Sequence, residues 1–242
     1  MLCMLLFGLL LFIPGHPAKA ACTLDRSRFA ELRSIQENFS IDSLEKIRQE
    51  LAIRKQLLHA TIDCAIEEAA NTQTNLEAFS GKDSYIQTFR AQLIGQLVNS
   101  ASYYRAEKTK IDYLGLRGSR EFAENVRDWR NNNYKLIAKD AANLVLWTDN
   151  QDLIEKARAR MSAIEPTIGL AKIVDNEKVQ VLWKDAQSHF EATTNHNRRA
   201  TTALRERRSA DEVLGLMKSS LEALAATYQK LLDISSAFSA TP

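Results

Sequence analysis

The sequence predicts an all-α protein, an elongated antiparallel helical bundle of about six or seven amphipathic helices that is partly coiled-coil-like. Strong helix formers such as Ala, Leu, Glu, Gln, Lys and Arg dominate the composition. Residues that break helices are scarce, because only Pro166, Pro242 and six glycines follow the first 20 residues. Apolar residues recur at spacings of three, four or seven, as on one face of a helix.

The first half of the chain is expected to form four helices. The first covers about residues 27–38, and Asp42 is expected to cap a second helix of more than 30 residues, with Glu45 completing a capping box. A break at 79–83 separates the second helix from the third. The third helix is expected over about 84–114, followed by a loop at 114–119 in which Ser119 caps the fourth, and Asn131–Asn133 interrupts the fourth.

The second half is expected to form three further helices. A turn at 148–150 precedes a fifth helix that ends near Ile164, and the weakly helical stretch 165–176 then contains Pro166 and Gly169. Asp175 is expected to cap a sixth helix, and a last helix over about 210–238 carries a stripe close to a heptad repeat. The predicted organisation is a signal peptide (1–20), a helical bundle domain (21–165), a hinge or linker (166–176) and a C-terminal helical hairpin packed on the same bundle (177–242).

The N-terminus resembles a secretory signal in its layout. Residues 1–13 form an uncharged apolar run, Pro14-Gly15 ends it, and Ala18-Lys19-Ala20 suits a signal peptidase. The run is shorter than the ~20 apolar residues that span a bilayer. We therefore expect cleavage after Ala20, a periplasmic or secreted protein, and no transmembrane anchor after cleavage.

Cleavage at that point leaves two cysteines, Cys22 and Cys64. In an oxidising compartment such a pair is expected to form a disulfide, and the alternative is two unpaired thiols. The bridge would stabilise the fold by roughly 3 to 5 kcal/mol in the chain-entropy model. Lipid attachment at Cys22 is a further alternative, although Lys19 stands where a lipoprotein signal has an aliphatic residue.

Composition and motifs argue against several classes of function. The net charge is only +2, without the clustered positive field that nucleic acid requires. Zinc, haem and di-iron motifs are absent, and so are a nucleophile elbow and a glycine-rich phosphate loop. Asp185, His189 and His196 share a helix face, but a solvated polar face explains them better than a metal site. We expect no enzymatic activity, no metal and no cofactor.

Three groups of residues are candidates for contacts with a ligand or partner. Thr193, His196 and Asn197 belong to a polar block that either lines a pocket, fixes helix register or is exposed. Trp129 and Tyr134 flank the asparagine run, where a helix irregularity with core aromatics is the alternative to a sugar or peptide site. Arg198 and Arg199 begin a basic cluster that suits either an anionic partner or the C-terminal end of a helix.

These observations favour an exported, non-enzymatic helical bundle that acts as a protein–protein interaction or scaffold module in the periplasm or cell envelope. Its long amphipathic faces would serve self-association or binding of a protein partner. The alternative is an extracytoplasmic bundle that binds a small-molecule ligand in a polar pocket near residues 193–197.

Overall fold

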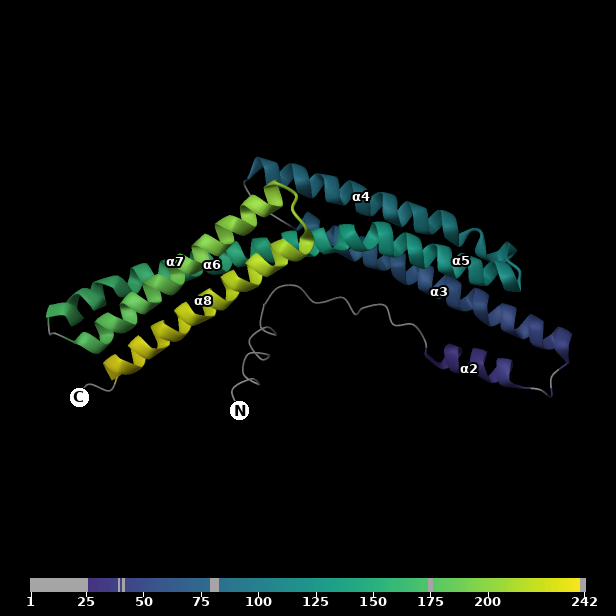
Figure 1. Cartoon of the computed structure of the whole chain (residues 1–242), viewed down its shortest axis with the longest axis horizontal. Helices are drawn as coiled ribbons and strands as arrows, with labels where there is room; N and C mark the ends of the chain where they lie inside the picture. Colours follow the sequence, from purple (N-terminus) through teal and green to yellow (C-terminus); the bar gives the residue numbers. More distant parts are fainter. Residues whose placement is uncertain (1–25, 39, 41, 79–82, 174–175, 240–242) are drawn as a thin grey trace. The chain divides into compact units, whose positions relative to one another are not determined.

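The computed structural model describes residues 26–38, 40, 42–78, 83–173 and 176–239, and this part of the chain is helical without strands. The predicted all-α fold is confirmed. Figure 1 shows the helices α2 (Arg26–Glu37), α3 (Ser43–Glu77), α4 (Ser84–Lys108), α5 (Leu116–Trp129), α6 (Lys135–Ile173), α7 (Glu177–Arg205) and α8 (Ala210–Ser239). A 3₁₀ turn (Ile111–Tyr113) precedes α5, and a π-helical turn (Arg130–Tyr134) joins α5 to α6. Among the described helices, none has the length and apolarity that a membrane span requires.

The chain divides into two compact units. Of the described residues, the first unit comprises those up to 71 and those from 101 to 124, and the second comprises those from 72 to 100 and from 125 onward. The boundaries between them fall within α3, α4 and α5. The predicted signal peptide (1–20) and Cys22 lie outside the described residues.

The first unit contains a core formed by apolar residues of α3, the end of α4, the 3₁₀ turn and α5. Its buried members are Ile53, Leu57, Ile62, Ala65, Ala69, Ala101, Tyr104, Ile111 and Phe122. Cys64 lies on α3 and is partly buried. Its bridge to Cys22 stays a prediction.

A buried carboxylate belongs to the same unit. Glu50 is only 7% exposed and accepts hydrogen bonds from Gln36 (2.8 Å) and from Arg54 (2.6 and 2.9 Å). Burial alone would raise the pKa of Glu50, but these hydrogen bonds and the charges of Arg54 and Arg120 lower it below its ordinary value. Glu50 therefore ties α2, α3 and α5 together as a charged group.

Helix ends agree with the sequence prediction at some positions and differ at others. The Asp42 carboxylate accepts from the backbone N–H groups of Leu44 (3.0 Å) and Glu45 (3.4 Å), which confirms the predicted N-cap. The prediction that the third helix reaches Leu114 was wrong, because α4 ends at Lys108. The prediction that Ser119 caps the next helix was also wrong. It lies inside α5, where its hydroxyl donates to the carbonyl of Leu116 (2.8 Å) and needs no other partner.

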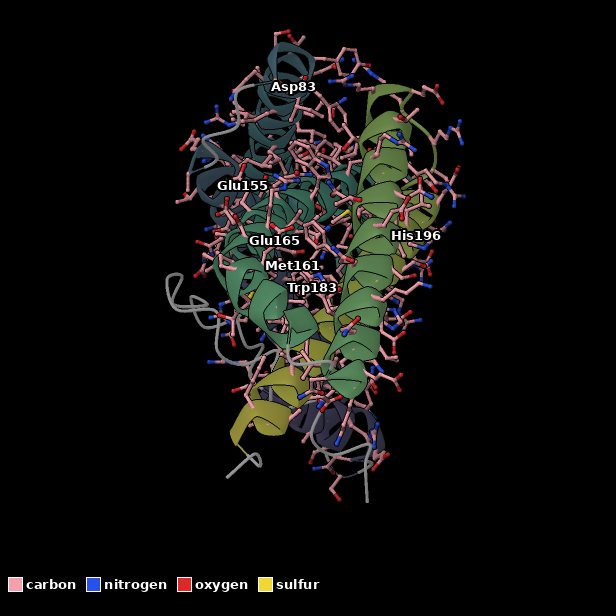
Figure 2. All side chains as sticks on the ribbon, turned by 90° about the vertical axis from the view of Figure 1, so that its left-hand side faces the viewer. Asp83, Glu155, Met161, Glu165, Trp183 and His196 are labelled. Atoms are coloured by element: carbon pink, nitrogen blue, oxygen red, sulfur yellow. The ribbon has the colours of Figure 1, made fainter. Side chains whose placement is uncertain are left out.

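In the second unit, α6, α7 and α8 pack side by side (Figure 1), with α7 antiparallel to the other two. Their buried residues recur mostly at intervals of three, four or seven, which lines one face of each helix toward the others. On α8 these are Val213, Met217, Ser220, Leu224, Thr227, Leu231 and Ile234. Met161 of α6 and Trp183 of α7, which are labelled in Figure 2, belong to an apolar cluster that also contains Ile168 and Leu231.

The predicted turn at 148–150 was wrong, because α6 runs through it without interruption. Thr148 donates its hydroxyl proton to the carbonyl of Leu144 (3.0 Å), a bond that a helix accommodates. Asn150 is fully buried and donates to side chains on α7 and α8. Tertiary hydrogen bonds thus satisfy polar groups that would otherwise favour a turn.

The predicted break was wrong for residues 165–173, because α6 continues through Pro166 and Gly169 to Ile173. Ile168 is 1% exposed within the apolar cluster, and its burial stabilises the helix beyond the proline. The predicted cap Asp175 lies outside the described residues, and Asn176 caps α7 by accepting from the N–H of Val179 (3.2 Å).

Candidate functional site

A layer of polar side chains crosses the interior of the α6–α8 group. Asn150 of α6 donates through Nδ2 to Oδ1 of Asn197 on α7 (3.2 Å) and to Oγ of Ser220 on α8 (3.0 Å). Gln151 also donates to Asn197 Oδ1 (2.9 Å), and Ser220 donates to the carbonyl of Thr193 (3.1 Å). Asn150, Thr193 and Ser220 are fully buried, so one hydrogen-bonded layer joins three helices.

The polar block predicted from the sequence is therefore only partly exposed. Thr193 and Asn197 face the interior, and Thr193 additionally donates to the carbonyl of His189 (2.9 Å). Asn150 and Ser220 complete the layer from the other helices, and sequence reasoning missed both. The sequence did carry a signal for Ser220, because it stands three residues after Met217 and four before Leu224, in step with the apolar positions of the last helix.

Two buried atoms of this region have no hydrogen-bond partner among the described residues: Asn150 Oδ1 and His196 Nδ1. His196 lies on α7 (Figure 2) and is partly buried. The other polar groups of the layer pair with one another across the three helices. Because its donors match only one axial alignment, it fixes the register of the three helices.

The two predicted aromatic contacts stand at the two ends of the π-helical turn: Trp129 precedes it, and Tyr134 is its last residue. Trp129 is partly exposed, whereas Tyr134 is fully buried beneath the guanidinium of Arg130, whose carbon lies 4.9 Å from the ring centroid. Asn133 donates to the carbonyl of Trp129 (3.0 Å) within the turn. The helix irregularity weighed from the sequence is thus observed, and Tyr134 belongs to the core.

The basic cluster separates into two parts. Arg198 and Arg199 are exposed on α7, where Arg198 donates to Asn195 (3.1 Å). Arg205 instead pairs with Asp83, and its hydrogen bond lowers the pKa of that carboxyl. Arg205, a further arginine of the cluster, therefore already has a carboxylate partner, whereas Arg198 and Arg199 are exposed.

An apolar pocket of about 470 Å³ lies between α6 and α8, and the sequence analysis did not identify it. Its lining carries two hydroxyls and no charge: Ile164, Thr167, Leu231, Ile234, Ser235 and Phe238. Leu232, the next residue along α8, exposes 62% of its surface. The signal in the sequence was Ile164 and the end of the α8 stripe, but the expected break at 165–176 concealed that both belong to one surface.

Metal chemistry has no obvious location in this part of the chain. Among the described residues, no group of three or more His, Cys, Asp or Glu side chains is placed to hold a metal ion. Asp185 forms an ion pair with Lys230 of α8 (2.9 Å).

In comparisons with known proteins, no family model, curated protein or solved structure matches the chain.

Proposed function

We propose that this protein is an exported, non-enzymatic interaction module, and that the apolar pocket between α6 and α8 receives an amphipathic helix of a partner protein. The main observation that supports this proposal is the pocket itself, because its uncharged lining suits aliphatic and aromatic side chains. Leu232 follows the lining residue Leu231 on α8 and is a large apolar side chain with 62% of its surface exposed.

The polar layer supports this assignment indirectly. Asn197 Oδ1 already accepts two hydrogen bonds from α6, and Ser220 both accepts and donates. These groups are engaged with one another, which favours a structural role over the ligand pocket considered near residues 193–197. By fixing the register of α6 and α8, the layer would hold the two walls of the apolar pocket in alignment.

Site-specific photo-crosslinking tests the proposal. A photoreactive residue at Leu232 is expected to capture a partner in the cell envelope, and Leu232→Glu is expected to weaken binding of that isolated partner at least tenfold. Val181→Glu is the matched control, because Val181 is equally exposed (60%) on α7 and does not line the pocket. Equal loss in both variants, or capture of a second copy of the chain alone, would contradict binding of a partner helix in the pocket.

Export is part of the same proposal and has its own test. The apolar N-terminal run and Ala18-Lys19-Ala20 motivate it. N-terminal sequencing of the protein recovered from the periplasm or medium is expected to begin at Ala21. Retention of residues 1–20 in a cytoplasmic fraction would refute export.

A further inference from the structure

A second cavity, of about 130 Å³, lies between α4, α6 and the connection from α7 to α8. All of its lining residues belong to the second unit: Phe89, Gln92, Leu93, Gln96, Asp140, Leu204, Arg207, Arg208 and Val213. Phe89, Leu93, Leu204 and Val213 are buried and form an apolar floor. The charged groups at the cavity are Asp140, Arg207 and Arg208.

Asp140 brings a carboxylate to the cavity. Its side chain is partly buried, and burial raises its pKa above the ordinary value. No ion pair within 4 Å connects Asp140 to any cation in the described part of the chain. The neighbouring Lys139 pairs with Asp211 instead (3.0 Å). A partly buried carboxylate of this kind attracts a cationic group.

Arg207 brings a cation to the same cavity from an unusual backbone conformation. Its φ of 53° lies in the left-handed region, where the N–H of Arg208 donates to the carbonyl of Ala203 (2.9 Å) and that of Arg207 to Leu204 (3.2 Å). This is the helix-ending Schellman pattern, in which glycine is the usual residue at that position. An arginine there costs about 1 kcal/mol of backbone energy relative to glycine.

The partners of Arg207 are neutral. Its guanidinium donates to Gln92 (2.6 Å) and lies over the ring of Phe89, 5.7 Å from the centroid. Arg208 differs, because Glu206 (2.6 Å) and Glu212 (2.9 Å) both pair with it. The cavity thus presents one unpaired carboxylate and one guanidinium without a counter-ion, and the two do not pair with each other.

We propose that this cavity binds a small zwitterion, a free α-amino acid with a short aliphatic side chain. Its ammonium group would pair with Asp140, its carboxylate with Arg207, and its side chain would contact Phe89 and Leu204. A simple anion would meet the Asp140 carboxylate, and a simple cation would meet Arg207, so a ligand with both charges fits best. The volume corresponds to about four water molecules at ~30 Å³ each, which suits one of the smaller amino acids.

Isothermal titration calorimetry of the purified chain tests the proposal, with L-alanine and L-valine as probes. Propionate and propylamine serve as analogues that each retain one charge. At least one amino acid is expected to bind, and both analogues are expected to bind at least tenfold more weakly. No binding of either amino acid at millimolar concentration, or propionate binding as tightly as alanine, would overturn the proposal.

Two variants test whether Asp140 and Arg207 bind the charged groups of the amino acid. Asp140→Asn and Arg207→Gly are each expected to weaken amino-acid binding at least tenfold, and glycine suits the positive φ of Arg207, so that variant keeps the fold. The matched controls Asp211→Asn and Arg198→Gln alter exposed charges outside the cavity and should bind as the wild type does. Unchanged binding in both cavity variants, with unchanged melting curves, would refute the site. This cavity and the apolar pocket share no lining residue. A negative result for amino-acid binding would therefore leave the proposal of partner binding unaffected, and the reverse holds as well.

Discussion

Replacing Pro166 with alanine should stabilise the protein, because α6 passes through this position as a continuous helix. A proline inside a helix lacks one N–H donor, and its ring clashes with the carbonyl of the residue four positions earlier, here Ser162. Alanine is favoured over proline by about 3 kcal/mol in a helix interior. Pro166 is exposed, so the change removes no buried surface.

The unfolded state reduces this gain. Proline restricts the unfolded chain, and losing that restriction costs about 0.4 to 1 kcal/mol. The net stabilisation of Pro166→Ala is therefore about 2 to 2.5 kcal/mol. For a chain of this size each kcal/mol shifts the melting temperature by about 2 to 4 °C, so Tm should rise by about 4 to 10 °C.

Thermal unfolding followed by circular dichroism at 222 nm measures the shift, and tryptophan fluorescence checks that the transition is two-state. Glu165→Ala is the matched control, because Glu165 is an exposed neighbour on the same helix (Figure 2) and glutamate and alanine have similar helix propensities. An unchanged or lower Tm for Pro166→Ala would refute the reasoning. It would mean that a new helix begins at Pro166, where proline is favourable, as the predicted hinge implied.

Three further predictions concern other positions. Gly169→Ala should raise stability by about 0.5 to 1 kcal/mol in urea denaturation, because an added Cβ meets no atom within 4 Å; a loss would show that the helix is broken there. Asn150→Asp should lower Tm strongly at pH 8 and less at pH 5, since a fully buried carboxylate is tolerated better when protonated; a pH-independent difference would contradict this. Glu50 has a lowered pKa, so its contribution is present above the unfolded-state pKa and is lost as pH falls through the folded-state value. Glu50→Gln should therefore be less stable than wild type at pH 7, with a difference that shrinks toward pH 3 in melting curves and would not shrink if packing alone were responsible.

The sequence was sufficient to predict the helices themselves. Helix-forming composition and apolar spacing predicted the final helix at 210–238, and α8 covers Ala210–Ser239. The N-cap at Asp42 could also be predicted from neighbouring residues alone, because a carboxylate before a helix accepts from the N–H groups two and three residues later. Such features depend on neighbours in the chain, which the sequence displays directly.

The interruptions were predicted poorly because they depend on tertiary contacts. Asn150 favours a turn by itself, yet here it is buried and donates to Asn197 and Ser220 on other helices. Pro166 similarly disfavours a helix, but burial of Ile168 two residues later stabilises α6 across it. The candidate site shared this weakness. Asn197 was identified from its own helix, whereas Asn150 and Ser220 became recognisable only once the three helices were packed.

The π-helical turn at Arg130–Tyr134 has a consequence for how the chain tolerates insertions and deletions. Val126 and Tyr134 are both buried and stand eight residues apart, although two turns of regular helix would bring the same face round after seven. One of the residues in this turn therefore acts as a single-residue insertion that the helix has absorbed. Deleting one asparagine from Asn131–Asn133 would therefore convert the turn to ordinary α-helix, while Tyr134 and the residues after it keep facing the core. The number of residues at this position can thus vary by one without changing the core. A homologous chain that lacks the π-helical turn should be aligned here with a gap of one residue before core positions are compared.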